Sequence, residues 1–158
     1  MRMKRFSLLW LCGIGLALAS PVREIVTIKL EAARAIAQKA LEACDRRGYA
    51  VSVAVVDAGG NLKVLLRHDE AGPHTVDSSF KKAYTALTLK RPTLELAGKI
   101  ARKPEIQALR DMNEQILLLG GGLPIRYRGR IVGAVGVGGA PGGELDEACA
   151  RAGLEILK

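Results

Sequence analysis

The strongest local constraint on this fold is a pair of apolar, alternating segments separated by a glycine turn. Residues 51–58 read Val-Ser-Val-Ala-Val-Val-Asp-Ala, and residues 62–67 resume the pattern as Leu-Lys-Val-Leu-Leu-Arg. Between them stands Gly59-Gly60-Asn61, whose residue types tolerate the backbone angles of a tight turn. The pattern predicts a β-hairpin over 51–67. Because a hairpin is not stable alone, we expect helices to pack on the sheet that contains it.

Helical periodicity surrounds this hairpin. Apolar residues recur at three and four positions from Leu30 to Arg47, and Gly48 follows as a common helix stop. Gly72-Pro73 marks a loop, after which the helical spacing returns. The first two predicted helices cover 30–47 and a segment from near His74 to Leu89. A third helix begins at Thr93 and breaks at Pro104, after which a short helical piece follows. The last predicted helix covers 144–157.

Three further apolar runs predict strands, at 116–119, 123–127 and 131–137, with the last two forming a second hairpin. The expected order is α-β-β-α-α-β-β-β-α. This is an α+β fold, with an antiparallel sheet of about five strands and helices packed on it. The sequence contains no repeat, linker or low-complexity tract, so residues 20–158 are expected to form a single domain.

Residues 1–19 have the three-part plan of a secretory signal peptide. Arg2, Lys4 and Arg5 precede an uncharged, mostly apolar run over 6–19, which closes with Ala17-Leu18-Ala19. This run is shorter than the roughly 20 residues that a membrane-spanning helix needs. We expect cleavage after Ala19 and a periplasmic or secreted protein, whose formal net charge falls from +8 to +5 when the three basic residues are removed.

The charge pattern argues against nucleic acid as a partner. Lys and Arg number 24 against 16 acidic residues, but they are scattered with acids between them. Aromatic residues make up only 4% of the chain, so few rings are available to stack on bases. A solvated surface is the simplest interpretation, and an anionic small molecule is the alternative.

Two cysteines, Cys44 and Cys149, remain after the expected cleavage. In an oxidising compartment they can pair, and they can equally be two buried small apolar side chains. The spacing lacks a C-x-x-C motif, which argues against redox catalysis and against a zinc site.

Two histidines, His68 and His74, lie between the first hairpin and the second helix. His74 stands three residues before Asp77, a spacing that suits a haem axial ligand whose imidazole is oriented by a carboxylate. The alternative is a surface histidine that caps the helix start. A divalent-metal site with Asp69 or Glu70 is less favoured, because no H-x-x-x-H spacing is present.

A hydrolase hypothesis would assign Ser78, His74 and Asp57 as nucleophile, base and orienting acid. No G-x-S-x-G turn supports it. The glycine-rich stretches do not form a nucleotide loop either, because Pro141 stands where G-x-G-x-x-G needs its third glycine. Tight turns explain these glycines, and close approach of a flat ligand is the alternative.

An ordered set of short motifs resembles the GlcG/HbpS-like family of haem-binding proteins, which also includes the C-terminal domain of PduO-type cobalamin adenosyltransferases. The resemblance covers residues 27–158. The motifs are Val51-Ser-Val-Ala-Val-Val-Asp57 with Gly59-Gly60, Lys82-Ala-Tyr-Thr-Ala86, Arg91-Pro-Thr93, Gly121-Gly-Leu-Pro-Ile125, Gly129-Arg-Ile-Val-Gly-Ala-Val-Gly136 and Asp146-Glu-Ala-Cys-Ala150.

This resemblance implies an antiparallel sheet flanked by helices, assembly into homo-oligomers from dimers to octamers, and binding of haem or a related tetrapyrrole. For an exported member it implies haem capture, storage or sensing, with haem degradation as a further activity and a membrane sensor as partner. Two alternatives are an enzyme acting on a small oxidised metabolite, as in glycolate utilisation, and a corrinoid-binding module.

Site residues follow from the resemblance position by position. His74 is the first choice as haem-iron ligand, with the hydroxyls of Thr75 and Thr85 as alternatives. Lys82 is expected either to meet a haem propionate or to form a structural ion pair at the subunit interface. The remaining candidates are Asp77 beside the ligand and a bend near the pocket formed by Gly121, Gly122 and Pro124. Asp57 is expected to tie down the Gly59-Gly60 turn.

Overall fold

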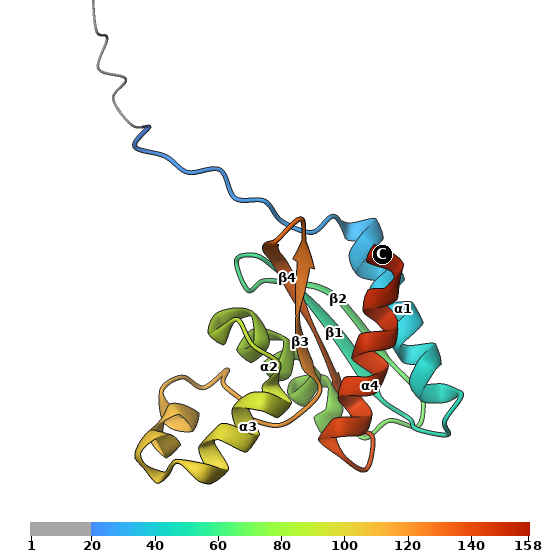
Figure 1. Cartoon of the computed structure of the whole chain (residues 1–158). Coiled ribbons are helices and arrows are strands. Elements are labelled where there is room, and N and C mark those ends of the chain that lie inside the picture. Colours follow the sequence, from blue (N-terminus) through green and yellow to red (C-terminus); the bar gives the residue numbers. More distant parts are fainter. Residues whose placement is uncertain (1–19) are drawn as a thin grey trace, which may run out of the picture.

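The computed structural model describes residues 20–158 (Figure 1). The predicted signal peptide, residues 1–19, lies outside the described residues. The elements follow one another as α1 (Leu30–Asp45), β1 (Ser52–Asp57), β2 (Leu62–Arg67), α2 (His74–Leu89), α3 (Thr93–Arg102), the 3-10 helix η1 (Pro104–Asp111), β3 (Gly122–Tyr127), β4 (Arg130–Gly138), α4 (Gly143–Leu154) and the 3-10 turn η2 (Glu155–Leu157).

The predicted α+β class is confirmed. Four strands form an antiparallel sheet in the order β2-β1-β4-β3, and both predicted hairpins are present. Figure 1 shows α1 and α4 side by side on one face of the sheet and α2 on the other, with α3 and η1 extending away from it. The main core lies under α1 and α4, where Val53, Val55 and Val135 meet Ile36 and other apolar side chains.

The expected strand at 116–119 is wrong, so residues 20–158 contain four strands and not about five. The amide of Ile116 closes a turn onto the carbonyl of Asn113 at 3.0 Å. The amide of Leu117 donates to the hydroxyl of Thr85 on α2 at 2.8 Å. Because these donors are used outside the sheet, the apolar run lies beside α2. Pairing begins only at Gly122.

Small residues line the face of the sheet that carries α2. Ala54, Gly136 and Gly122 are cross-strand neighbours, so they form one row that points to the same face. A β-carbon added at Gly136 would lie 2.1 Å from the carbonyl oxygen of Ser79, and one at Gly122 would lie 2.2 Å from that of Lys82. The row therefore lets the backbone of α2 rest directly on the sheet.

Gly136→Ala is expected to lower the free energy of unfolding by about 1–3 kcal/mol, because the added methyl overlaps the α2 backbone and forces it away from the sheet. Urea unfolding measures the change. Gly98→Ala is the matched control, since a β-carbon there meets nothing closer than 3.6 Å within α3. The control should gain about 0.5–1 kcal/mol, and equal effects at the two sites would contradict the packing argument.

Cys44 of α1 and Cys149 of α4 form a disulfide with a Cα–Cα distance of 5.5 Å. Both side chains are fully buried. Of the two sequence interpretations, the structure selects pairing. The bond ties the second residue from the end of α1 to the middle of the last α-helix across the main core.

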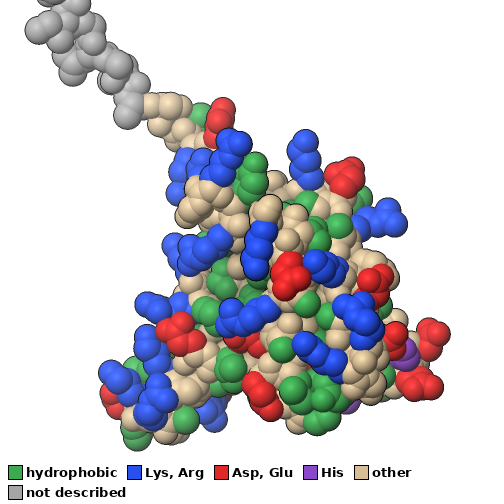
Figure 2. All heavy atoms as spheres, turned by 45° about the vertical axis from the view of Figure 1, so that its right-hand side comes forward, with side chains coloured by type: hydrophobic (Ala, Val, Ile, Leu, Met, Phe, Trp, Pro, Cys, Tyr) green, Lys and Arg blue, Asp and Glu red, His purple; other side chains and the backbone are tan. Residues whose placement is uncertain are grey.

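The surface carries mixed charge. Figure 2, which brings α1 and α4 forward, shows Lys and Arg side chains spread over this face with acidic and apolar side chains between them. No helix within residues 20–158 is long and apolar enough to cross a membrane.

Candidate functional site

An open apolar groove lies between the first hairpin and α2. Its volume is about 600 Å³, within the range of small-molecule sites. The α2 residues that line it recur at helical spacing and so share one helix face. Leu62 from the hairpin is half exposed in it. The lining residues are Gly60, Asn61, Leu62, Leu65, Pro73, Val76, Asp77 and Phe80.

His74 is the first residue of α2 and is not itself one of the residues that line this groove. Its side chain is exposed, and its neighbours Pro73 and Val76 line the groove. The ring packs over Gly72, where a β-carbon would lie 2.7 Å from Cε1. Asp77 has a different partner from the one the sequence suggested, because its carboxylate lies 3.1 Å from the ammonium of Lys81.

The other histidine is engaged elsewhere. His68 Nε2 lies 3.5 Å from the carboxylate of Asp45, and its Nδ1 accepts the amide of Glu70 at 3.2 Å. No group of three or more His, Cys, Asp or Glu side chains that could hold a metal ion occurs within residues 20–158.

Asp57 and Ser78, two of the residues named for a hydrolase, make separate structural hydrogen bonds. The carboxylate of Asp57 accepts the amides of Gly59 and Asn61 at 2.8 and 3.0 Å, which ties down the hairpin turn. Ser78 donates its hydroxyl to the carbonyl of Thr75 at 3.3 Å. In the described part of the chain these contacts do not link Asp57, His74 and Ser78 into a relay.

The two threonines predicted as alternative iron ligands are buried and already bonded. Thr75 donates to the carbonyl of Gly72 at 2.6 Å and shares a 2.7 Å hydrogen bond with Ser52. Thr85 accepts the amide of Leu117 at 2.8 Å. Of the three side chains named for the iron, His74 is therefore the one that is exposed.

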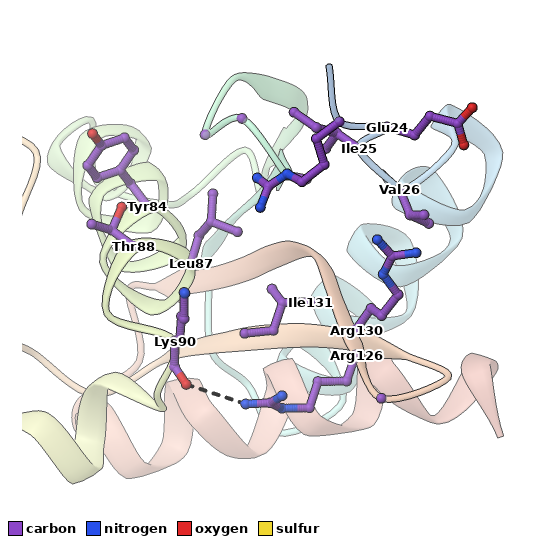
Figure 3. A pocket seen from close by; sticks show the side chains of 15 residues that line it. Glu24, Ile25, Val26, Tyr84, Leu87, Thr88, Lys90, Arg126, Arg130 and Ile131 are labelled. Atoms are coloured by element: carbon purple, nitrogen blue, oxygen red, sulfur yellow. Dashed lines mark hydrogen bonds between the residues drawn. The ribbon is translucent and has the colours of Figure 1, made fainter. Parts of the chain in front are cut away.

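A second cavity lies at the opposite end of α2. Figure 3 shows this basic pocket, which has a volume of about 560 Å³. The residue-23–26 segment, the Gly59-Gly60 turn, the end of α2 and the β3–β4 hairpin each contribute to its wall. Its cationic residues are Arg23, Lys90, Arg126 and Arg130, and Glu24 is its one acidic lining residue. Sequence reasoning missed it, because these residues come from three segments that only the fold brings together.

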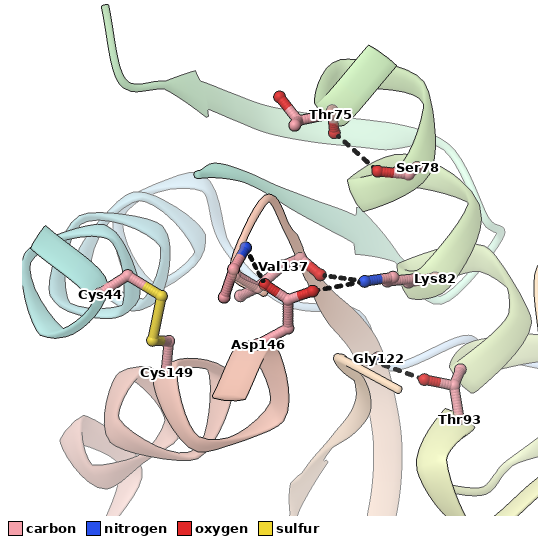
Figure 4. Close-up of polar contacts among 10 residues, drawn as sticks. Cys44, Thr75, Ser78, Lys82, Thr93, Gly122, Val137, Asp146 and Cys149 are labelled. Atoms are coloured by element: carbon pink, nitrogen blue, oxygen red, sulfur yellow. Dashed lines mark hydrogen bonds and ion pairs between the residues drawn. A yellow bond between two sulfur atoms is a disulfide. The ribbon is translucent and has the colours of Figure 1, made fainter. Parts of the chain in front are cut away.

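Lys82 forms a buried ion pair with Asp146 (Figure 4). Its ammonium, 2% exposed, donates to Asp146 Oδ2 at 2.6 Å and to the carbonyl of Val137 at 3.0 Å. The other carboxylate oxygen accepts the amide of Ala140 at 3.0 Å. Burial raises the pKa of Asp146 above its ordinary value, while the charge and hydrogen bond of Lys82 oppose that rise.

This pair places Lys82 in the interior, between α2 and α4, and not at either cavity. Its partner Asp146 was assigned no role from the sequence. The only feature that pointed to Asp146 was its place at the start of the last family motif. The two residues are 64 positions apart, so local spacing could not have joined them.

The glycines predicted near the pocket pack against the same interior. A β-carbon on Gly121 would lie 2.5 Å from the carbonyl oxygen of Val137, and Gly121 has a φ of +120°. The amide of Gly122 donates to the hydroxyl of Thr93 at 2.8 Å. Pro124 lies on the edge strand β3 beside Arg126, where it lines a separate shallow cavity. These three residues therefore lie away from His74 and the groove.

Comparison with known proteins gives a consistent family. Residues 28–155 match the family described as haem degrading protein HbpS-like. A double mutant of Streptomyces reticuli HbpS is 44% identical, with a TM-score of 0.82 over 90% of this chain and 94% of that chain. Protein GlcG of Escherichia coli K12 is 32% identical over 114 residues, which cover 71% of this chain and 81% of GlcG.

A more distant structure shares the fold. The crystal structure of a PduOC:haem complex has a TM-score of 0.75 at 23% identity, and the match covers 84% of this chain and 96% of that chain.

Proposed function

Since this chain belongs to the GlcG/HbpS-like family, we propose that it is a haem-binding protein. The family description refers to haem degradation, and PduOC was crystallised with haem. The observation in this chain that carries the proposal is an exposed histidine, His74, at the start of the helix whose residues Val76 and Phe80 line an open apolar groove.

The residues present suit the chemistry of haem. An exposed histidine nitrogen is a common axial ligand for haem iron. Phe80, Val76 and Leu62 offer apolar contact to a flat macrocycle, and the groove is open to solvent. His74 would hold the iron, and the apolar side chains would cover part of the ring. Bound haem would supply a redox-active iron at the surface of the protein.

Export and assembly belong to the same proposal. Residues 1–19 have the pattern of a signal peptide, and an oxidising compartment suits the Cys44–Cys149 disulfide. We assign the mature chain, one domain over residues 20–158, to haem capture, storage or sensing outside the cytoplasm. A homo-oligomer and a membrane sensor partner complete the proposal.

The test is a hemin titration of the purified protein, followed at the Soret band. His74→Ala should raise the dissociation constant by about 10-fold or more, because loss of even an outer partner of a metal ligand costs about 10- to 100-fold. It should also move the Soret maximum of the bound form, since the axial ligand changes.

His68→Ala is the matched control, because His68 is a histidine six positions away that bonds Asp45 and Glu70 instead. It should leave both readouts unchanged. A wild-type protein that does not saturate with hemin would refute the proposed function. Equal saturation in the wild type, His74→Ala and His68→Ala would support haem binding and would contradict His74 as the iron ligand.

A further inference from the structure

We propose that the basic pocket is a carboxylate-binding site for an organic polyanion. A free polycarboxylate is the expected source of the carboxylates, and the propionates of a haem that is not held through His74 are the alternative that the test separates. The propionate source rests on the proposed function, and the free polycarboxylate does not.

The pocket carries an unbalanced positive charge. Arg23, Lys90, Arg126 and Arg130 line it against the single acid Glu24. The ion pairs formed within residues 20–158 use other cations, such as Lys81, Arg91 and Lys99. Four cations around one cavity of about 560 Å³ repel one another, so an anion bound between them would relieve that repulsion.

The helix dipole explains only one of these cations. Lys90 follows the last residue of α2, where the carbonyl end of a helix attracts positive charge. Arg126 and Arg130 belong to β3 and β4, and Arg23 to the segment before α1. Arg126 is also held near the cavity by a hydrogen bond from its guanidinium to the carbonyl of Lys90 at 3.4 Å (Figure 3).

The donors of the pocket suit carboxylate groups. Three of the four cations are arginines, whose planar guanidinium groups match carboxylate oxygens in pairs. Apolar side chains of Tyr84, Leu87 and Ile131 share the wall with them (Figure 3). A ligand that uses both surfaces has several anionic oxygens on a carbon body. Organic polycarboxylates have this composition.

The basic pocket adjoins the apolar groove but lies far from His74. The two cavities share Gly60, and the rings of Phe80 and Tyr84 are 6.2 Å apart between them. His74 and Lys90 lie at opposite ends of α2, about 24 Å apart at the rise of an α-helix. A haem held through His74 is too short to place its propionates beside Lys90. This distance favours a free polycarboxylate in the pocket.

Citrate is the probe for the free ligand, measured by calorimetry on the purified protein against potassium chloride at equal ionic strength. Arg126→Gln combined with Arg130→Gln should raise the citrate dissociation constant by about 10-fold or more, because two charge-assisted contacts are lost. The matched control combines Arg102→Gln with Arg110→Gln, two exposed arginines that make the same change in net charge. The control should bind citrate as the wild type does.

Hemin and its dimethyl ester distinguish the propionate source. If the pocket takes propionates, the Arg126/Arg130 double variant weakens hemin binding and leaves ester binding unchanged. The inference is overturned if the wild type shows no saturable citrate binding and the double variant binds hemin normally, or if the control variant loses binding equally. A wild-type protein that binds citrate but not hemin would refute the proposed function and would still support the carboxylate-binding site.

Discussion

Replacing Cys44 and Cys149 together by alanine is expected to lower the free energy of unfolding by about 4–5 kcal/mol. The disulfide closes a loop across a sequence separation of 105 residues. A crosslink of that span stabilises chiefly by removing conformations from the unfolded chain, and the loop-entropy relation gives about 4.7 kcal/mol for 100 residues. Because the bond joins α1 to α4, its loss should favour separation of the two helices that cover the main core.

Urea unfolding with and without dithiothreitol measures this effect. Reduction should bring the wild type close to the alanine variant, and the variant itself should not respond to the reductant. Mass spectrometry of the denatured, unreduced protein after thiol alkylation provides an independent readout. Alkylated Cys44 and Cys149 in that experiment would contradict the disulfide and the stability difference derived from it.

Removal of Lys82 should have an effect of similar size. Lys82→Met is expected to cost about 3–5 kcal/mol, because it leaves the buried carboxylate of Asp146 without its ionic partner. Adding Asp146→Leu removes the orphaned charge. The double variant should therefore lose at least about 1 kcal/mol less than the sum of the two single variants, as measured by a double-mutant cycle in urea.

The pH dependence of Lys82→Met separates a lost charge partner from lost packing. Without Lys82, the folded-state pKa of Asp146 rises further above its ordinary value of 3.8. The folded protein then holds a proton that the unfolded chain releases, so stability falls as pH rises from about 3.8 through the folded-state pKa. Lys82→Met should thus be less destabilised near pH 4 than at pH 8. A loss that is equal at both pH values would indicate packing alone.

Local patterns predicted most of the elements correctly. The hairpin at 51–67, the helix from His74 to Leu89 and the helix start at Thr93 are observed where the periodicity and turn residues placed them. The segment at 116–119 failed, because a short apolar run fits a strand and a buried coil equally well. Its backbone amides donate to the carbonyl of Asn113 and the hydroxyl of Thr85, and no local sequence rule predicts the contact with Thr85.

The candidate site was also predicted only in part from the sequence. His74 could be named as a candidate because its residue type and its place at a helix start are visible in the chain, and the structure leaves it exposed at the start of α2. Its role as iron ligand stays a prediction. Lys82 was identified by motif, but its partner Asp146 was not. The basic pocket was missed entirely, since its cations are scattered over more than a hundred residues of sequence.

The sequence by itself determined the α+β class, the helices, both hairpins and the family, because these depend on alternation, helical spacing and turn residues within short windows. Only the tertiary structure decided which charges meet and which stay unpaired. Gly136 and Gly122 let α2 rest on the sheet, and that close packing buries Lys82 against Asp146 while it leaves Lys90 beside Arg126 at the far end of the helix. Charge pairing depends on distance in space, which separation along the chain does not set.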